Sequence, residues 1–182
     1  MLFGWDRFRG WAVLRFFLGG GSAAIHPNGL AKRLGISVST AQAYLSAYEK
    51  QGVLEKEKTA NIVQYRLRET PFTLELKKAF FVFEMLPFAA RFAGDNPAVT
   101  ALALYGSHAK GTFDEKSDID LIAIAQQKKM RLDALRKLEE KTGKEAKMQV
   151  FSMAEWKKML EGGDSFAWAI AKNSVLLAGA GL

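Results

Sequence analysis

The segment Val99–Ile124 reads VTALALYGSHAKGTFDEKSDIDLIAI and contains two apolar runs separated by a polar loop. Each run has the length and composition of a buried β-strand, and the first leads directly into Gly106 and Ser107. The second run begins with Asp118 and Asp120, which alternate with apolar residues. Because successive side chains of a strand point to opposite faces, we expect both carboxylates on one face, roughly 7 Å apart.

Two carboxylates on one face repel each other unless a cation lies between them. Hard oxygen ligands suit Mg²⁺, which proteins typically hold through one or two carboxylates together with substrate phosphates. Gly106 lets a ligand approach the backbone closely, and the free N–H groups of a helix starting at Ser107 favour phosphate. The segment therefore predicts a site for a metal-bound nucleoside triphosphate.

A Gly-Ser pair followed, after ten residues, by Asp-x-Asp closely resembles the DNA polymerase beta-like nucleotidyltransferase superfamily. The nearest group is the minimal nucleotidyltransferases, and the resemblance covers about residues 97–182. It implies binding of a nucleoside triphosphate with Mg²⁺ or Mn²⁺, and transfer of a nucleotidyl group to an acceptor. The implied positions are Gly106, Ser107 and Lys110 for the nucleotide, and Asp118 and Asp120 for catalysis and metal binding. For Lys110, a solvated side chain without a role is the alternative.

Active members of that superfamily usually have a third carboxylate on a later strand. Residues 146–151 are expected to form that strand, and Gln149 is the best-placed residue on its aspartate-facing side, with Glu145 at its start. A neutral amide is a poor Mg²⁺ ligand and cannot accept a proton from an attacking hydroxyl. Transfer to an acceptor, such as a protein hydroxyl, is therefore one hypothesis. The alternative is a regulator or antitoxin whose domain only senses nucleotide or binds a toxin-like partner.

The N-terminal half has a different pattern. Residues 28–52 predict two short helices in which Gly35 ends the first, Ser37 caps the second and Gly52 ends it. Two strand-like runs follow, at residues 53–58 and 62–67. An amphipathic helix within residues 1–18 precedes them. Over roughly residues 6–70 this order resembles the winged helix-turn-helix DNA-binding domains of prokaryotic regulators.

The charge distribution agrees with a polyanionic partner for this half. Residues 1–94 carry 13 basic and 7 acidic side chains, so they hold most of the net charge of +7. The resemblance implies that the second helix enters the major groove of double-stranded DNA. The candidate DNA-binding residues are Ser39, Thr40, Gln42 and Ser46 on that helix, and Lys56 and Lys58 on the hairpin. A domain that binds protein or only dimerises is the alternative.

Residues 72–93 are strongly apolar and predict a helix that Pro87 kinks or splits. Burial of this helix between the two domains is one interpretation, and a homodimer interface through residues 71–93 is the other. The expected fold class is α+β with two domains. Residues 1–70 form a winged helix (helical with a β-hairpin wing), 71–96 a connecting helix, and 97–182 a nucleotidyltransferase fold with a small mixed sheet flanked by helices.

Composition excludes several other functions. The chain has no cysteine and two histidines, which excludes disulfides, thiolate zinc sites and a multi-histidine metal site within one chain. His108 is interpreted as a helix-surface residue, and Trp168 as part of the core. No uncharged run approaches the ~20 residues of a membrane span, and Arg15 interrupts the one stretch that resembles a signal peptide. We therefore expect a cytoplasmic protein without a membrane partner.

Overall fold

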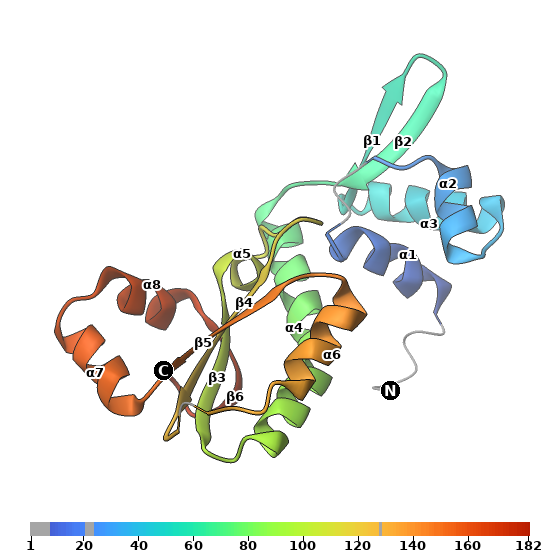
Figure 1. The fold of residues 1–182 in the computed structure, drawn as a ribbon. Coiled ribbons are helices and arrows are strands. Elements are labelled where there is room, and N and C mark those ends of the chain that lie inside the picture. The colour runs from blue at the N-terminus through green and yellow to red at the C-terminus, as the bar shows by residue number, and fades with distance from the viewer. Residues whose placement is uncertain (1–7, 21–23, 128) are drawn as a thin grey trace. The chain divides into compact units, whose positions relative to one another are not determined.

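The computed structural model describes residues 8–20, 24–127 and 129–182, which form α-helices and two separate β-sheets (Figure 1). Contacts divide the chain into two units, Met1–Phe80 and Phe81–Leu182. The boundary lies within the long helix α4 (Pro71–Asp95). Of the helix predicted within residues 1–18, residues 1–7 lie outside the described residues.

The first unit consists of three helices followed by a two-stranded hairpin. Its elements are α1 (Arg9–Leu18), α2 (Pro27–Leu34), α3 (Val38–Lys50), β1 (Leu54–Thr59) and β2 (Ile62–Leu67). As predicted, Gly35 ends α2 in the left-handed conformation, and the Ser37 hydroxyl caps α3 by accepting the N–H of Thr40 at 3.1 Å. Ile25 adds a short antiparallel bridge to Tyr65 of β2. The buried core of this unit comprises Val13, Phe17, Leu30, Ala31, Ala41, Leu45, Val53, Leu54 and Tyr65.

Helix α4 is continuous, so Pro87 does not split it, whereas a kink at Pro87 stays a prediction. A proline removes only one backbone donor, and apolar packing on both sides of Pro87 keeps the helix in place. Met85, Phe88 and Phe92 are buried in the core of the second unit, whereas Leu76 packs against the core of the first. Much of the apolar surface of α4 is thus used inside one chain. A homodimer through this helix stays a prediction.

The second unit contains a four-stranded sheet in the order β5-β4-β3-β6. The strands are β3 (Val99–Tyr105), β4 (Ile119–Ala125), β5 (Ala146–Phe151) and β6 (Val175–Gly179). Strand β4 pairs antiparallel with β3 and parallel with β5, whereas β6 pairs antiparallel with β3. The sheet is therefore mixed, as predicted.

Helices cover both faces of this sheet (Figure 1). The C-terminal part of α4 and helix α6 (Asp133–Thr142) pack on the face that carries Leu104 and Leu121. Helices α7 (Met153–Glu161) and α8 (Ser165–Asn173) pack on the face that carries Ile122 and Ile124. No helix within the described ranges is long and apolar enough to cross a membrane.

Two sequence-based interpretations are wrong. His108 is fully buried in the short helix α5 (Gly106–Lys110), where its ring lies 4.2 Å from that of Phe81 and 4.4 Å from that of Phe113. Its buried position follows from the turn of α5 against α4, which brings Phe81 over it. Trp168 is 57% exposed, and its indole N–H donates to the carbonyl of Leu160 at 3.0 Å.

Candidate functional site

Strand pairing brings the Gly-Ser turn and the two aspartates together. Tyr105, the last residue of β3, lies opposite Asp120 in the antiparallel register with β4. The chain then turns at Gly106, whose φ is +70°. A Cβ atom built on Gly106 would overlap the Asp120 carboxylate. A glycine is thus needed here both for its conformation and for the space that the carboxylate occupies.

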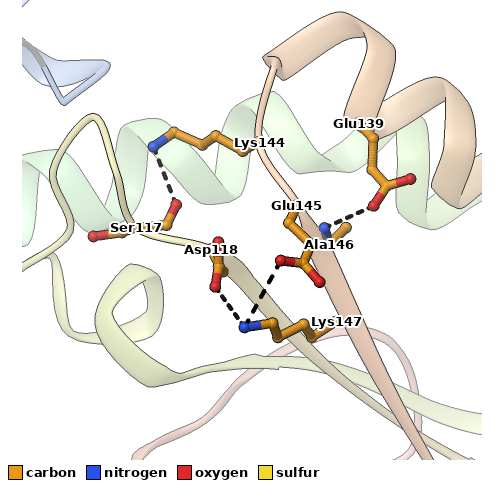
Figure 2. A network of polar contacts seen from close by, with 7 residues as sticks. All are labelled: Ser117, Asp118, Glu139, Lys144, Glu145, Ala146 and Lys147. Carbon is orange, nitrogen blue, oxygen red and sulfur yellow. Dashed lines mark hydrogen bonds and ion pairs between the residues drawn. The ribbon is translucent and has the colours of Figure 1, made fainter.

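Asp118 lies directly before β4, at the end of a loop that Lys144 holds in place. The Lys144 ammonium donates to the backbone carbonyls of Asp114, Glu115 and Ser117 at 2.7, 2.9 and 3.1 Å. Figure 2 shows Lys144 reaching Ser117 from the segment before β5. Partial burial lowers the pKa of Lys144, and nearby acids oppose that change. This lysine is a positioning residue that the sequence analysis did not identify.

Lys147 points at the aspartates from β5. The parallel register places Lys147 beside Asp120, and its ammonium lies 2.6 Å from Oδ2 of Asp118 (Figure 2). Oε2 of Glu145 lies 3.9 Å from the same nitrogen. The hydrogen bond from Lys147 to Asp118 is the main cause that raises the pKa of Lys147. The position alongside the second aspartate is therefore occupied by a cation.

Gln149 lies two residues further along β5, where it pairs in register with Ile122. Its amide donates to the hydroxyl of Tyr105 at 3.1 Å. The register thus places Lys147 rather than Gln149 beside Asp120, and Gln149 as the position of a third carboxylate stays a prediction. The alternation of β5 was predicted, but its register with β4 cannot be derived from alternation alone.

Of the two aspartates, Asp120 is the one whose ionisation is unfavourable in the folded protein. Desolvation raises the pKa of its carboxyl group most, and the negative charge of Asp118 adds to the effect, whereas Lys147 opposes it. Burial and the charge of Asp120 also raise the pKa of the Tyr105 hydroxyl. A cation bound between the two aspartates would relieve this cost.

The donor set fits one hard divalent cation. Asp118 and Asp120 supply carboxylate oxygens, and the Asp120 carboxylate lies directly against the backbone at Gly106. Among the described residues, no group of three His, Cys, Asp or Glu side chains lies together in a way that could hold a metal ion. Ser107 is half-buried beside this position, and Lys110 is exposed at the end of α5.

The six candidate DNA-binding residues occupy two places in the first unit. Ser39, Thr40, Gln42 and Ser46 lie on α3, and Lys56 and Lys58 are exposed on β1. The Ser37 hydroxyl lies within hydrogen-bond distance of the hydroxyls of Ser39 and Thr40, at 2.9 and 2.7 Å. The Gln42 amide donates to Ser46 at 3.1 Å and to the hydroxyl of Tyr65 at 2.9 Å.

The two faces of the hairpin differ in charge. Lys56 lies opposite Tyr65, and Lys58 lies on the same face because side chains alternate along β1. On the other face, the Arg66 guanidinium lies 2.6 Å from both Glu55 and Glu57. The lysines therefore share a face with Tyr65, to which α3 is hydrogen-bonded, while the arginine is neutralised on the opposite face.

Comparisons with known proteins find a match to one family. The model of the Polymerase beta, Nucleotidyltransferase family matches residues 89–179, which is half of the chain. A crystal structure of a toxin–antitoxin with AMP-PNP is 19% identical, with a TM-score of 0.38, over 52% of this chain and 73% of that chain. An IcIR transcriptional regulator from Alicyclobacillus acidocaldarius is 17% identical, with a TM-score of 0.32, over 54% of this chain and 42% of that chain.

Both TM-scores are too low to establish a shared fold. No curated protein matches the chain.

The close approach of Gly106 to Asp120 predicts a large cost for a side chain there. We expect Gly106→Ala to lower the free energy of unfolding by about 1–3 kcal/mol, since the alanine would take a φ of +70° and its Cβ would overlap the Asp120 carboxylate. Gly143→Ala is the matched control, because Gly143 has a φ of +66° with no atom within 4 Å of a built Cβ. Urea unfolding of both variants checks this. Equal losses would show that the Asp120 carboxylate does not restrict Gly106.

The raised pKa of Asp120 predicts that its charge destabilises the fold. A carboxyl group whose pKa is higher in the folded state binds its proton more readily there, so ionisation at neutral pH opposes folding. We expect Asp120→Asn to raise the melting temperature at pH 7. The gain should shrink as the pH falls through the raised pKa toward the ordinary value of 3.8, where wild-type Asp120 is also neutral.

Thermal unfolding of both proteins between pH 3 and pH 7 measures this dependence. Asp118→Asn is the control, because it removes a partner of Lys147 instead of the desolvated charge. A lower melting temperature for Asp120→Asn at pH 7 would contradict the prediction.

Proposed function

The chain belongs to the Polymerase beta, Nucleotidyltransferase family, and we propose from that premise that its second unit binds a nucleoside triphosphate together with Mg²⁺ or Mn²⁺. The observation that carries the proposal is the close approach of Gly106 to the Asp120 carboxylate. It joins the two halves of the Gly-Ser and Asp-x-Asp motif at one end of the sheet. Gly106 and Ser107 contact the phosphates, Asp118 and Asp120 hold the cation, and Lys110 meets phosphate charge.

The cation would neutralise phosphate charge at the place where the two carboxylates meet. The chain's own residues position the carboxylates: Gly106 leaves room for the Asp120 carboxylate, and Lys144 holds the loop that carries Asp118. Support comes from the raised pKa of Asp120, because carboxyl groups whose pKa is shifted by desolvation and by a charged neighbour are common in ligand sites.

For the first unit we propose a winged helix that binds double-stranded DNA. Support comes from the element order of three helices and a hairpin, with the Ile25 bridge to Tyr65 beside the hairpin. In this proposal α3 enters the major groove, and Lys56 and Lys58 contact phosphates. The hydrogen bonds of Gln42 to Ser46 and Tyr65 hold its amide on the exposed side of α3, where Ser39 also lies.

Together the two units make a DNA-binding regulator with a nucleotide-sensing domain. Transfer of a nucleotidyl group to an acceptor is the second candidate, favoured by the intact Gly-Ser and Asp-x-Asp motif and weakened because Lys147 and Gln149, not acids, follow Ala146 on the aspartate-facing side of β5. An antitoxin that acts by binding a toxin-like protein partner is the third, and it requires neither ligand.

Calorimetry with the Mg²⁺ complexes of ATP, GTP, CTP and UTP tests the nucleotide proposal. We expect at least one of them to bind the wild-type chain, and Asp118→Ala to weaken that binding by about tenfold or more. Asp133→Ala, which removes an exposed aspartate from α6, should have no effect. Equal affinity of the wild type and Asp118→Ala, or no binding of any triphosphate, would refute the proposed site.

The same proteins, given α-phosphate-labelled triphosphate and a cell lysate, distinguish sensing from transfer. Label that reaches a lysate component with the wild type but not with Asp118→Ala would favour the transferase candidate.

DNA binding is tested with a random-sequence duplex over a series of salt concentrations. We expect affinity to fall with salt, and Lys56→Gln/Lys58→Gln to reduce the slope of log affinity against log salt by about two. Lys77→Gln/Lys78→Gln makes the same charge change on α4 and should leave the slope unchanged. A duplex that does not bind, or equal slopes in both double variants, would reject this interface.

A further inference from the structure

The ion pair between Lys147 and Asp118 contributes too little stability to explain why a lysine lies at this position. Its ammonium lies 2.6 Å from Asp118, on the strand residue in register with Asp120. Side chains at both ends of this ion pair are partly exposed, 51% for Lys147 and 37% for Asp118. Ion pairs with that degree of exposure stabilise folded proteins very little. A gain in stability therefore does not account for a lysine that contacts Asp118 and lies in register with Asp120.

The site has fewer negative charges than a site that binds two divalent cations. Two-metal sites clamp the attacking and leaving oxygens between a pair of cations, which requires several carboxylates around them. Here Asp118 and Asp120 supply two negative charges, and Lys147 already supplies one positive charge at Asp118. Glu145 is 65% exposed, and its carboxylate lies 3.9 Å from the same ammonium.

Resting on the proposed function, we infer that Lys147 takes the place of a second divalent cation, so that the chain binds a nucleoside triphosphate with one divalent cation only. The ammonium has three N–H donors, and one of them is sufficient for Asp118. The remaining donors belong to a half-exposed side chain and suit a phosphate oxygen of the ligand. A fixed monovalent charge neutralises phosphate but does not activate a hydroxyl, so this site favours binding over transfer.

Counting manganese on the nucleotide-bound chain tests the inference. The probes are Mn²⁺ and the α,β-methylene analogues of ATP and GTP, whose α–β bond cannot be cleaved by transfer. After equilibrium dialysis, manganese and bound analogue are measured in the same sample. We expect one Mn²⁺ per bound analogue in the wild type and two in Lys147→Asp, because the aspartate supplies the third carboxylate.

Two further variants separate the carboxylate from the loss of the lysine. Lys147→Met supplies no carboxylate and should keep one Mn²⁺ per bound analogue. Lys141→Asp is the matched control, since Lys141 is also partly exposed and paired, at 3.5 Å from Glu84, but lies on α6 against the opposite face of the sheet. It should likewise keep one Mn²⁺.

Two Mn²⁺ per bound analogue in the wild type, or one in a Lys147→Asp protein that unfolds at the wild-type temperature, would overturn the role of Lys147. A wild-type chain that retains neither analogue would instead refute the proposed nucleotide binding, because the inference about Lys147 concerns only the number of cations that accompany the nucleotide.

Discussion

The antiparallel pairing of Tyr105 with Asp120 is the contact on which the site depends. It ends β3 at the point where β4 begins, so that the turn at Gly106 lies against the Asp120 carboxylate. A one-residue slip would send Asp120 to the face of the sheet that packs against α4 and α6. The buried residues of β4, among them Leu121 and Ile122 on opposite faces, make that slip costly and hold the aspartate where it is.

The charges around this contact do not favour folding. Desolvation of Asp120 and its proximity to Asp118 oppose folding, and the half-exposed Lys147 offsets only part of that cost. Lys144 contributes differently, because it binds three backbone carbonyls and thereby fixes the loop before Asp118. One lysine positions the loop, and the other supplies positive charge beside Asp118.

Local patterns predicted much of this fold. The limits of β3 and β5, the Ser37 cap and the end of α2 at Gly35 follow from alternation and from residues with strong local preferences. Long-range facts were missed: the register that aligns Lys147 with Asp120, and the burial of His108 between Phe81 and Phe113. Both depend on residues that are distant in the chain. The continuity of α4 through Pro87 likewise depends on tertiary packing, which helix propensities do not take into account.

The central claim is that the end of the sheet formed by β3 and β4 holds a triphosphate and a single cation. A crystal structure with Mn²⁺ and the α,β-methylene analogue of ATP or GTP, whichever binds, tests it most directly through the anomalous signal of manganese. The account predicts one anomalous peak ligated by Asp118 or Asp120, with the phosphates beside Gly106 and Ser107. An analogue bound elsewhere on the chain, or manganese that neither aspartate ligates, would contradict it.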